Sequence, residues 1–226
     1  MRGPFCVAID FDGTVTDTDV IDAVLQAFAS PAWRDVEALW ERGAIGSREC
    51  LELQMDMVGQ PLERLLRFVD GFSIDPTFGD FLRFLRGEKI PFAVVSDGFG
   101  IFIERLLQNA GLADVPILAN GLIEEQGMLE MLFPHADPRC ASANCKCRAV
   151  DALCGGRDLV VIGDGRSDFC LARKAVHVFS KRALTRFCRE QGLPHTAFDR
   201  FSQIPDVMRE LLIPSPRSIA VPAGKD

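Results

Sequence analysis

The stretch "FCVAIDFDGTVTDTD" (residues 5–19) begins with five apolar residues and then places four aspartates close together. A short apolar run bounded by turn signals is typical of a buried parallel strand. Asp10 and Asp12 follow it directly, and Gly13 indicates that the chain turns there. Carboxylates this close repel one another, so they need a cation, a shared proton or a specific hydrogen-bond network. A Mg²⁺ ion, which prefers oxygen ligands, meets that need, whereas a turn that merely ends the strand is the structural alternative.

The rest of the chain alternates strand-like and helical patterns. Further apolar runs occupy residues 90–95, 158–162 and, more weakly, 177–180. Helical patterns occupy residues 76–88, 100–111, 147–155 and 167–175. This alternation predicts an α/β protein with a doubly wound, mostly parallel sheet. Ligands of such sheets bind at the carboxyl ends of the strands, where we expect Asp10, Ser96 and Asp164 to meet.

Residues 18–72 carry only helical signals, and this interval is too long for a single crossover between strands. We predict that it forms a helical domain inserted after the first strand. The catalytic core is then made of residues 1–17 and 73–213. The tail, residues 214–226, is rich in proline and small residues and is expected to be loosely ordered.

Residues 115–134 are expected to form a β-hairpin. Two turn signals support it, Asn120-Gly121 and Gln126-Gly127.

Composition narrows the class of protein. A chain of 226 residues with a formal net charge of -7 is poorly suited to non-specific binding of nucleic acid or of anionic membranes. No apolar run is long enough to span a bilayer, and the N-terminal segment is too short for a signal peptide. We therefore expect a cytoplasmic protein whose partner is a small molecule. The sequence leaves the oligomeric state open.

Eight cysteines are many for such a chain. Five lie in apolar or helical segments, where we expect reduced thiols that behave as small hydrophobes: Cys6, Cys50, Cys154, Cys170 and Cys188. A loop offers a possible structural Zn²⁺ site from four residues: His135, Cys140, Cys145 and Cys147. The single residue between the last two cysteines fits no standard zinc ribbon, so reduced loop cysteines are the favoured interpretation.

A second acidic motif, "VVIGDGRSDF" (residues 160–169), again follows an apolar strand. Asp164 at the strand end is placed to complete a metal site with Asp10, and Asp168 is placed to fix a metal-bound water. The structural alternative is that Asp168 lies in the first turn of a helix, where a negative charge is favourable.

Four motifs together resemble those of the haloacid dehalogenase superfamily of phosphatases. They are "DFDGT" (residues 10–14), "VVSDG" (94–98), a lysine before a helix, and "GDGRSD" (163–168). The resemblance implies a Rossmann-like core and Mg²⁺-dependent hydrolysis of a small phosphate ester through an aspartyl-phosphate.

The same resemblance assigns roles in the reaction. It makes Asp10 the nucleophile and a metal ligand, and Asp12 the general acid and base. Asp12 also gives the metal its backbone carbonyl, and Asp164 completes the metal site. Lys146 neutralises charge on the nucleophile and the phosphate; Arg148 is the rival cation, but a compact ammonium fits better beside two carboxylates.

The resemblance also places Ser96, Asp97 and Gly98 around the phosphoryl oxygens. Asp97 departs from the "SGG" of many relatives, which leaves its role open between a capping contact and a substrate contact.

The helical insert resembles the type 1 cap of the phosphoserine-phosphatase branch. In that branch, an acidic residue nine positions after the nucleophile reads the substrate, and Asp19 holds that position here; a helix N-cap is its alternative role. Arg48 and Glu49 are further candidates for substrate contact from the cap. The chain is also similar to phosphatases of methionine salvage in "ASPAWRD" (residues 29–35), in a Pro-His pair before the cysteine-rich loop, and in "CREQ" (188–191).

Two other functions stay open beside hydrolysis. Phosphoryl transfer to another acceptor would use the same aspartyl-phosphate. A non-catalytic protein that binds a phosphorylated metabolite is disfavoured by the presence of Asp10, Asp12, Lys146 and Asp164.

Overall fold

A computed structural model describes residues 5–212, so the tail at 214–226 lies outside the described residues. Seven strands form one sheet in the order β4-β3-β2-β1-β5-β6-β7. Every neighbouring pair is parallel except β3 and β4, which form an antiparallel hairpin. The strands are β1 (Phe5–Ile9), β2 (Phe92–Phe99), β3 (Ile117–Glu125), β4 (Met128–Leu132), β5 (Asp158–Gly163), β6 (His177–Ser180) and β7 (His195–Ala197). The doubly wound α/β sheet expected from the sequence is confirmed.

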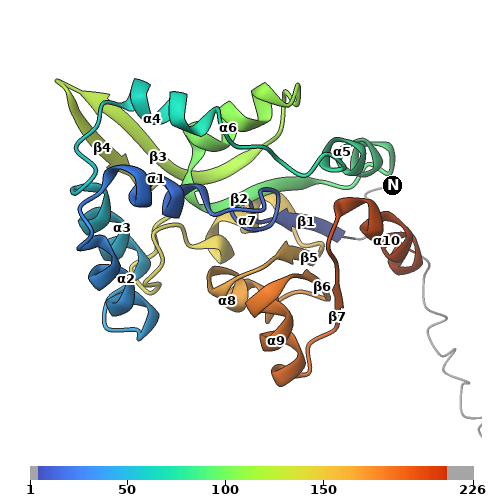
Figure 1. Cartoon of the computed structure of the whole chain (residues 1–226). Helices are drawn as coiled ribbons and strands as arrows, with labels where there is room; N and C mark the ends of the chain where they lie inside the picture. Colours follow the sequence, from blue (N-terminus) through green and yellow to red (C-terminus); the bar gives the residue numbers. More distant parts are fainter. Residues whose placement is uncertain (1–4, 213–226) are drawn as a thin grey trace, which may run out of the picture.

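Helices cover both faces of this sheet (Figure 1). Alternation along β1 explains the two layers, because Phe5, Val7 and Ile9 belong to one apolar cluster while Cys6 and Ala8 belong to the other. Buried residues of three helices pack in the first cluster: α5 (Phe78–Gly87), α6 (Gly100–Asn109) and α10 (Ile204–Leu212). The second contains α7 (Lys146–Cys154), α8 (Phe169–Ala172) and α9 (Arg182–Gln191).

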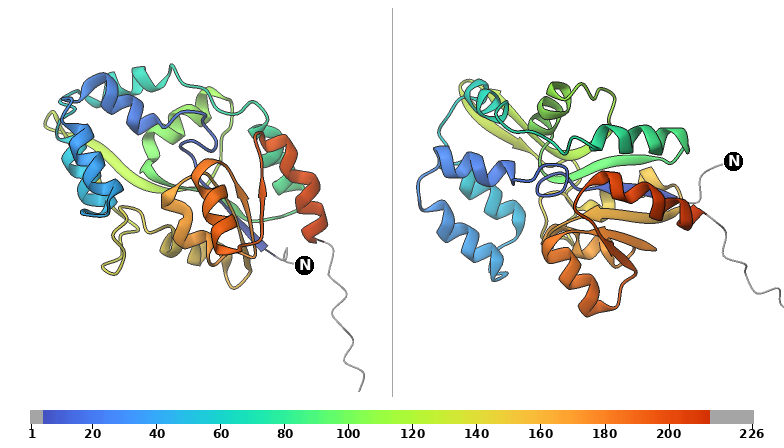
Figure 2. Two further views of the ribbon diagram at one scale, coloured as in Figure 1. Left: turned by 60° about the horizontal axis from the view of Figure 1, so that its bottom comes forward. Right: turned by 45° about the vertical axis from the view of Figure 1, so that its right-hand side comes forward.

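The segment between β1 and β2 supplies four more helices. They are α1 (Val20–Phe28), α2 (Trp33–Glu41), α3 (Ser47–Met55) and α4 (Leu62–Val69). Helices α1 to α3 gather at one end of the sheet (Figure 2), while α4 packs against α6. An isolated bridge between Thr16 and Ile74 joins the two chain segments that lead into and out of this insert. We propose that residues 18–72 act as a cap on the core.

Two local predictions require correction. The second strand does not end at Ser96; β2 continues to Phe99, with a shift of register after Val95. Asn120-Gly121 is not a turn, because both residues lie inside β3, where the strand passes from pairing with β2 to pairing with β4. The hairpin turns instead at Gln126-Gly127, where both residues have positive φ angles.

The expectation that Cys6 and Cys154 are reduced is wrong. A disulfide joins them, with their Cα atoms 5.2 Å apart and a sequence separation of 148. Cys6 faces α7 from β1, and Cys154 is the last residue of that helix, so the two thiols meet only when the helix packs on the strand. The other six cysteines are free. Within residues 5–212, no helix is long and apolar enough to cross a membrane.

Reduction should lower the free energy of unfolding of this protein. A cross-link that closes so long a loop typically contributes about 2–5 kcal/mol, and a reductant removes that contribution. Urea unfolding with and without a reductant measures the difference, and unfolding without a reductant should release six titratable thiols. The double variant Cys6→Ala/Cys154→Ala should be insensitive to the reductant, whereas Cys188→Ala, which removes a buried free thiol, should keep the full sensitivity. Eight thiols in the unreduced protein would contradict the disulfide.

Candidate active site

The polar residues that end the central strands meet in one cavity. Asp10 follows β1, which pairs in parallel with β2 on one side and β5 on the other, so its end lies beside Ser96 and Asp164. A cavity of about 280 Å³ opens here between the sheet and the insert. Asp10, Asp12, Ser96 and Asp164 all line it.

Lys146 is the cation at the centre of this site. Its Nζ lies 2.6 Å from Asp10 Oδ1 and 2.6 Å from Asp168 Oδ1, and all three side chains are buried. Burial lowers the pKa of Lys146, but the two carboxylates outweigh it, so the pKa is raised and the ammonium stays charged. Arg148, the alternative cation, instead donates to the backbone oxygen of Ala136 outside the cavity.

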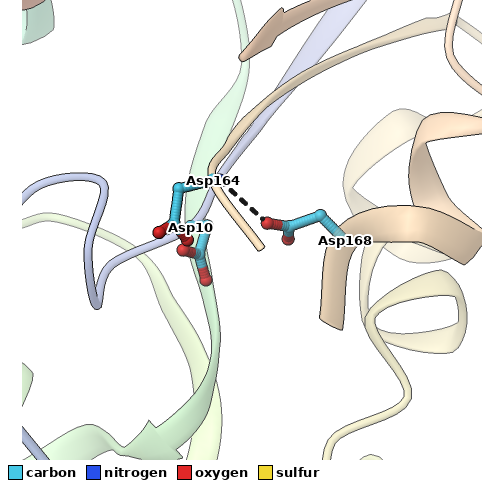
Figure 3. Close-up of side chains that lie close together, drawn as sticks. All are labelled: Asp10, Asp164 and Asp168. Atoms are coloured by element: carbon cyan, nitrogen blue, oxygen red, sulfur yellow. Dashed lines mark hydrogen bonds between the residues drawn. The ribbon is translucent and has the colours of Figure 1, made fainter. Parts of the chain in front are cut away.

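Three carboxylates converge beside that lysine: Asp10, Asp164 and Asp168 (Figure 3). One oxygen from each lies within 4.8 Å of the others. Gly13 makes the approach possible, because a Cβ at this position would collide with the Asp164 carboxylate, and the φ of Gly13 is +73°. A buried set of oxygen ligands with this excess of negative charge fits a hard divalent cation.

Asp168 lies in this cluster, whereas the carboxylate of Asp12, whose expected ligand atom is its backbone carbonyl, lies outside it. Asp168, expected only to fix a water, lies within the cluster and also accepts hydrogen bonds from the backbone nitrogens of Asp164 (3.2 Å) and Gly165 (3.4 Å). The carboxylate of Asp12 points elsewhere, where it accepts from Val20 N (2.9 Å) and Ser96 Oγ (3.4 Å).

Burial governs the protonation of the two strand-end aspartates. The pKa of Asp10 is raised to about 8 by burial and by Asp168, against the opposing effect of Lys146. The pKa of Asp12 is raised well above its usual range by burial and then by Asp19. A cation beside Asp10 would favour its ionised form, because an opposite charge stabilises the carboxylate.

The strand β2 contributes Ser96, Asp97 and Gly98 to the cavity wall. Ser96 Oγ accepts a hydrogen bond from Gly98 N (2.9 Å), in the part of β2 where the register shifts. The oxygens of Asp97 accept hydrogen bonds from the hydroxyl of Ser47 (2.7 Å) and the backbone nitrogen of Asn144 (2.6 Å).

Of the two roles that the sequence left open for Asp19, the structure shows the helix cap, whereas contact with the substrate stays a prediction. Asp19 is the N-cap of α1, with Oδ1 accepting from Asp22 N at 3.0 Å, and it also lines the cavity. Burial and the neighbouring Asp22 raise its pKa to about 6.

Arg48 and Glu49 are not brought into the cavity. The helical period of α3 turns Ser47, Cys50 and Gln54 toward the cavity, which leaves the two residues between them on another face. Arg48 pairs with Glu52 and lies 4.4 Å above the ring of Phe133.

Other residues of the cavity wall had not been anticipated: Asp22, Glu37, Trp40, Arg166 and Arg182. The guanidinium of Arg182 pairs with Asp164 Oδ2 at 3.1 Å, and its backbone has a φ of 41°. A signal for Arg182 was present in the sequence, because it lies two residues after the fourth apolar run (177–180), near the carboxyl end of an expected strand. The cap residues depend on how the insert folds onto the core, which no local pattern reveals.

The possible zinc ligands His135, Cys140, Cys145 and Cys147 do not form a cluster of this kind. Among the described residues, the only group of three or more potential ligands that lie this close together is the aspartate cluster.

Comparisons with known proteins agree with this geometry. The model of the haloacid dehalogenase-like hydrolase family matches residues 7–173. The chain is 32% identical to a 2-hydroxy-3-keto-5-methylthiopentenyl-1-phosphate phosphatase of Exiguobacterium sibiricum, over 88% of this chain and 94% of that protein. It is 31% identical to the protein of the same name from Brevibacillus brevis, over 92% and 95%.

Solved structures share the fold. A phospho-aspartyl intermediate analogue of phosphoserine phosphatase superposes with a TM-score of 0.68 at 16% identity, covering 92% of this chain and 99% of that one. A substrate-bound phosphoserine phosphatase gives 0.69 at 16% identity, with the same coverage. The family match and the relatives above 30% identity along most of the chain show that the protein belongs to the haloacid dehalogenase-like hydrolases and is a phosphatase.

Proposed function

We propose that this phosphatase is a Mg²⁺-dependent phosphomonoesterase that works through an aspartyl-phosphate on Asp10. The observation that carries the proposal is the buried pair between Lys146 Nζ and Asp10 Oδ1 inside the aspartate cluster. An ammonium held against a strand-end carboxylate orients that carboxylate and neutralises charge as an anionic substrate approaches.

In the first step, a carboxylate oxygen of Asp10 attacks phosphorus and the bond from phosphorus to the ester oxygen breaks. The neutral acid Asp12 gives its proton to the leaving oxygen. Thr14 Oγ1, which donates to Asp10 Oδ2 at 3.0 Å, and Lys146 fix the plane of the nucleophile. In the second step, the ionised Asp12 takes a proton from a water that attacks the phosphorus, which releases phosphate and restores Asp10.

Asp10 and Asp164, together with the backbone carbonyl of Asp12, would hold the Mg²⁺ ion, with Asp168 beside them. Bound there, the ion supplies positive charge to the phosphoryl oxygens. Asp168 also pairs with Lys146 Nζ, and this second ion pair holds the ammonium beside the nucleophile.

For the substrate, we propose 2-hydroxy-3-keto-5-methylthiopentenyl-1-phosphate. Relatives that carry this name match about nine tenths of the chain. The cap side of the cavity also has apolar surface from Ile21, Trp40 and Leu51, which suits a thioether tail.

A phosphorylated amine, such as phosphoserine, is the second candidate. Asp19, Asp22 and Glu37 line the cap side of the same cavity. Burial and neighbouring carboxylates raise the pKa of both Asp22 and Glu37, and a cationic group on the substrate would relieve that repulsion.

Catalytic efficiency on the two esters separates the candidates. We expect a kcat/KM at least about tenfold higher for the thioether ester than for phosphoserine or phosphoethanolamine, because neither amine has an apolar tail to bury. The reverse order would favour the amine. No hydrolysis of any phosphate ester with Mg²⁺ would contradict the proposed function.

Asp10→Asn should abolish turnover, by at least about a thousandfold, because an amide cannot attack phosphorus. The side chain keeps its shape, and circular dichroism should show an intact fold. Asp35→Asn, on the exposed face of α2, is the matched control and should retain full activity. Turnover of Asp10→Asn within tenfold of the native enzyme would rule out the covalent mechanism.

Chelation should remove activity, and added Mg²⁺ should restore it. Asp164→Ala should raise the Mg²⁺ concentration needed for half-maximal activity by about tenfold or more, because it deletes a charged oxygen ligand. Asp158→Ala changes an exposed aspartate at the opposite end of the same strand and should leave the requirement unchanged. Full activity in excess chelator would be incompatible with the metal site.

Asp19→Ala should lower kcat/KM on the preferred substrate by about tenfold, the cost of one charge-assisted hydrogen bond. A small aryl phosphate, which does not reach the cap, should be hydrolysed nearly as before. The loss of the N-cap should also lower the free energy of unfolding by about 1 kcal/mol. Equal kinetic losses on both substrates would leave Asp19 with the capping role alone.

A further inference from the structure

Asp97 connects three parts of the molecule through its carboxylate. One oxygen accepts from the backbone nitrogen of Asn144 at 2.6 Å, and the other accepts from the hydroxyl of Ser47 at 2.7 Å. Asp97 lies on the core strand β2, and Ser47 is the first residue of the cap helix α3. Asn144 lies in the loop that leads into α7, two residues before Lys146.

The hydroxyl of Ser47 extends this connection to a second point of the loop. It accepts a hydrogen bond from Ala143 N at 2.8 Å, so two consecutive backbone nitrogens of the loop are held by Ser47 and Asp97. The side chain of Asn144 fixes the same loop to the core, because its Nδ2 donates to the backbone oxygens of Ser96 and Leu118, both at 2.7 Å. The start of the lysine-bearing helix is therefore tied to the core and to the cap together.

The cap and this loop are also in close steric contact. A Cβ at Gly46, directly before α3, would collide with the backbone oxygen of Ala141. The carboxylate of Asp97 also lies at the N-terminus of α3, where a negative charge is favourable.

We propose that Asp97 is a positioning residue whose carboxylate latches the closed cap to the loop that places Lys146 against Asp10. Withdrawal of Ser47 leaves Ala143 N without its acceptor and Asp97 with one side-chain partner fewer. Restoring the cap restores both bonds, so cap closure and the position of Lys146 are coupled. The kinetic consequence rests on the proposed function, whereas the coupling itself does not.

The kinetic test uses p-nitrophenyl phosphate with Mg²⁺, because this small ester reports the chemistry without contacts to a specific substrate. Ser47→Ala should lower kcat by about five- to tenfold, and Asp97→Ala by about tenfold or more, with little change in KM. Asp97→Asn should retain most of the activity, because its amide can accept from Asn144 N and donate to Ser47. Ser30→Ala, an exposed cap serine with no side-chain hydrogen bond to the described residues, is the control.

The double variant Ser47→Ala/Asp97→Ala distinguishes a latch from two separate bonds. If Asp97 acts through Ser47, the double variant should be no slower than Asp97→Ala alone, since one break already opens the connection. Additive losses would overturn the proposal, as would an Asp97→Asn variant as slow as Asp97→Ala.

Hydrogen–deuterium exchange tests the coupling without reference to activity. Ser47→Ala changes a cap residue, yet amides of residues 141–145 should exchange at least about tenfold faster while the midpoint of urea unfolding stays unchanged. Faster exchange confined to α3 would overturn the latch. If the enzyme hydrolyses no phosphate ester, the proposed function fails while this measurement still decides the coupling. If Asp97→Ala does not fold, Ser47→Ala and Asp97→Asn carry the test.

Discussion

The ion pairs of Lys146 with Asp10 and Asp168 are the constraint on which the rest of the structure depends. Charges so deeply buried are stable only with partners in good geometry, and removing one partner of a buried pair typically costs about 3–5 kcal/mol. The three residues come from the end of β1, the start of α7 and the short helix after β5. The packing of β1, α7 and this short helix must therefore bring the three charged side chains within hydrogen-bond distance of one another.

Helix α7 is fixed to β1 at both of its ends. Its first residue, Lys146, meets Asp10 just beyond the carboxyl end of the strand, and its last residue, Cys154, is bonded to Cys6 near the other end. The helix therefore runs antiparallel to the strand with little freedom to slide. The disulfide, far from the cavity, and the ion pair inside it thus fix the same alignment of α7 on β1. In this way a disulfide can support a site that it does not contact.

The parts of the site that follow from local pattern could be predicted from the sequence. Asp10, Asp12 and Asp164 end apolar strands, and parallel strands bring their carboxyl ends together whatever the details of packing. The residues that could not be predicted depend on packing between distant segments. Cys6 and Cys154 meet only once α7 lies on β1, and Ser47 meets Asp97 only once the insert lies on the core.

The same dependence on packing explains why the residues of the insert that line the cavity differ from those expected. Arg48 and Glu49 are charged residues of an expected helix, but the face that a helix turns to the core is set by packing, which here selects Ser47, Cys50 and Gln54. The role of Asp97 was open for the same reason. By charge alone, the carboxylate of Asp97 would be unfavourable beside a phosphate site. Only the folded position of the insert and of the loop before α7 shows that Ser47 and Asn144 donate hydrogen bonds to it.

Charge balance links the core to the cap. Four carboxylates, those of Asp10, Asp12, Asp164 and Asp168, face one buried ammonium and the half-exposed guanidinium of Arg182. An anionic phosphate ester enters such a site only if further positive charge is supplied or a carboxylate is neutral. Burial raises the pKa of Asp12 well above its usual range, and a divalent cation would compensate the charge of the other carboxylates. Because water would screen both effects, a cap closed over the site would strengthen them, and the latch proposed for Asp97 would hold that cap to a loop residue two positions before Lys146.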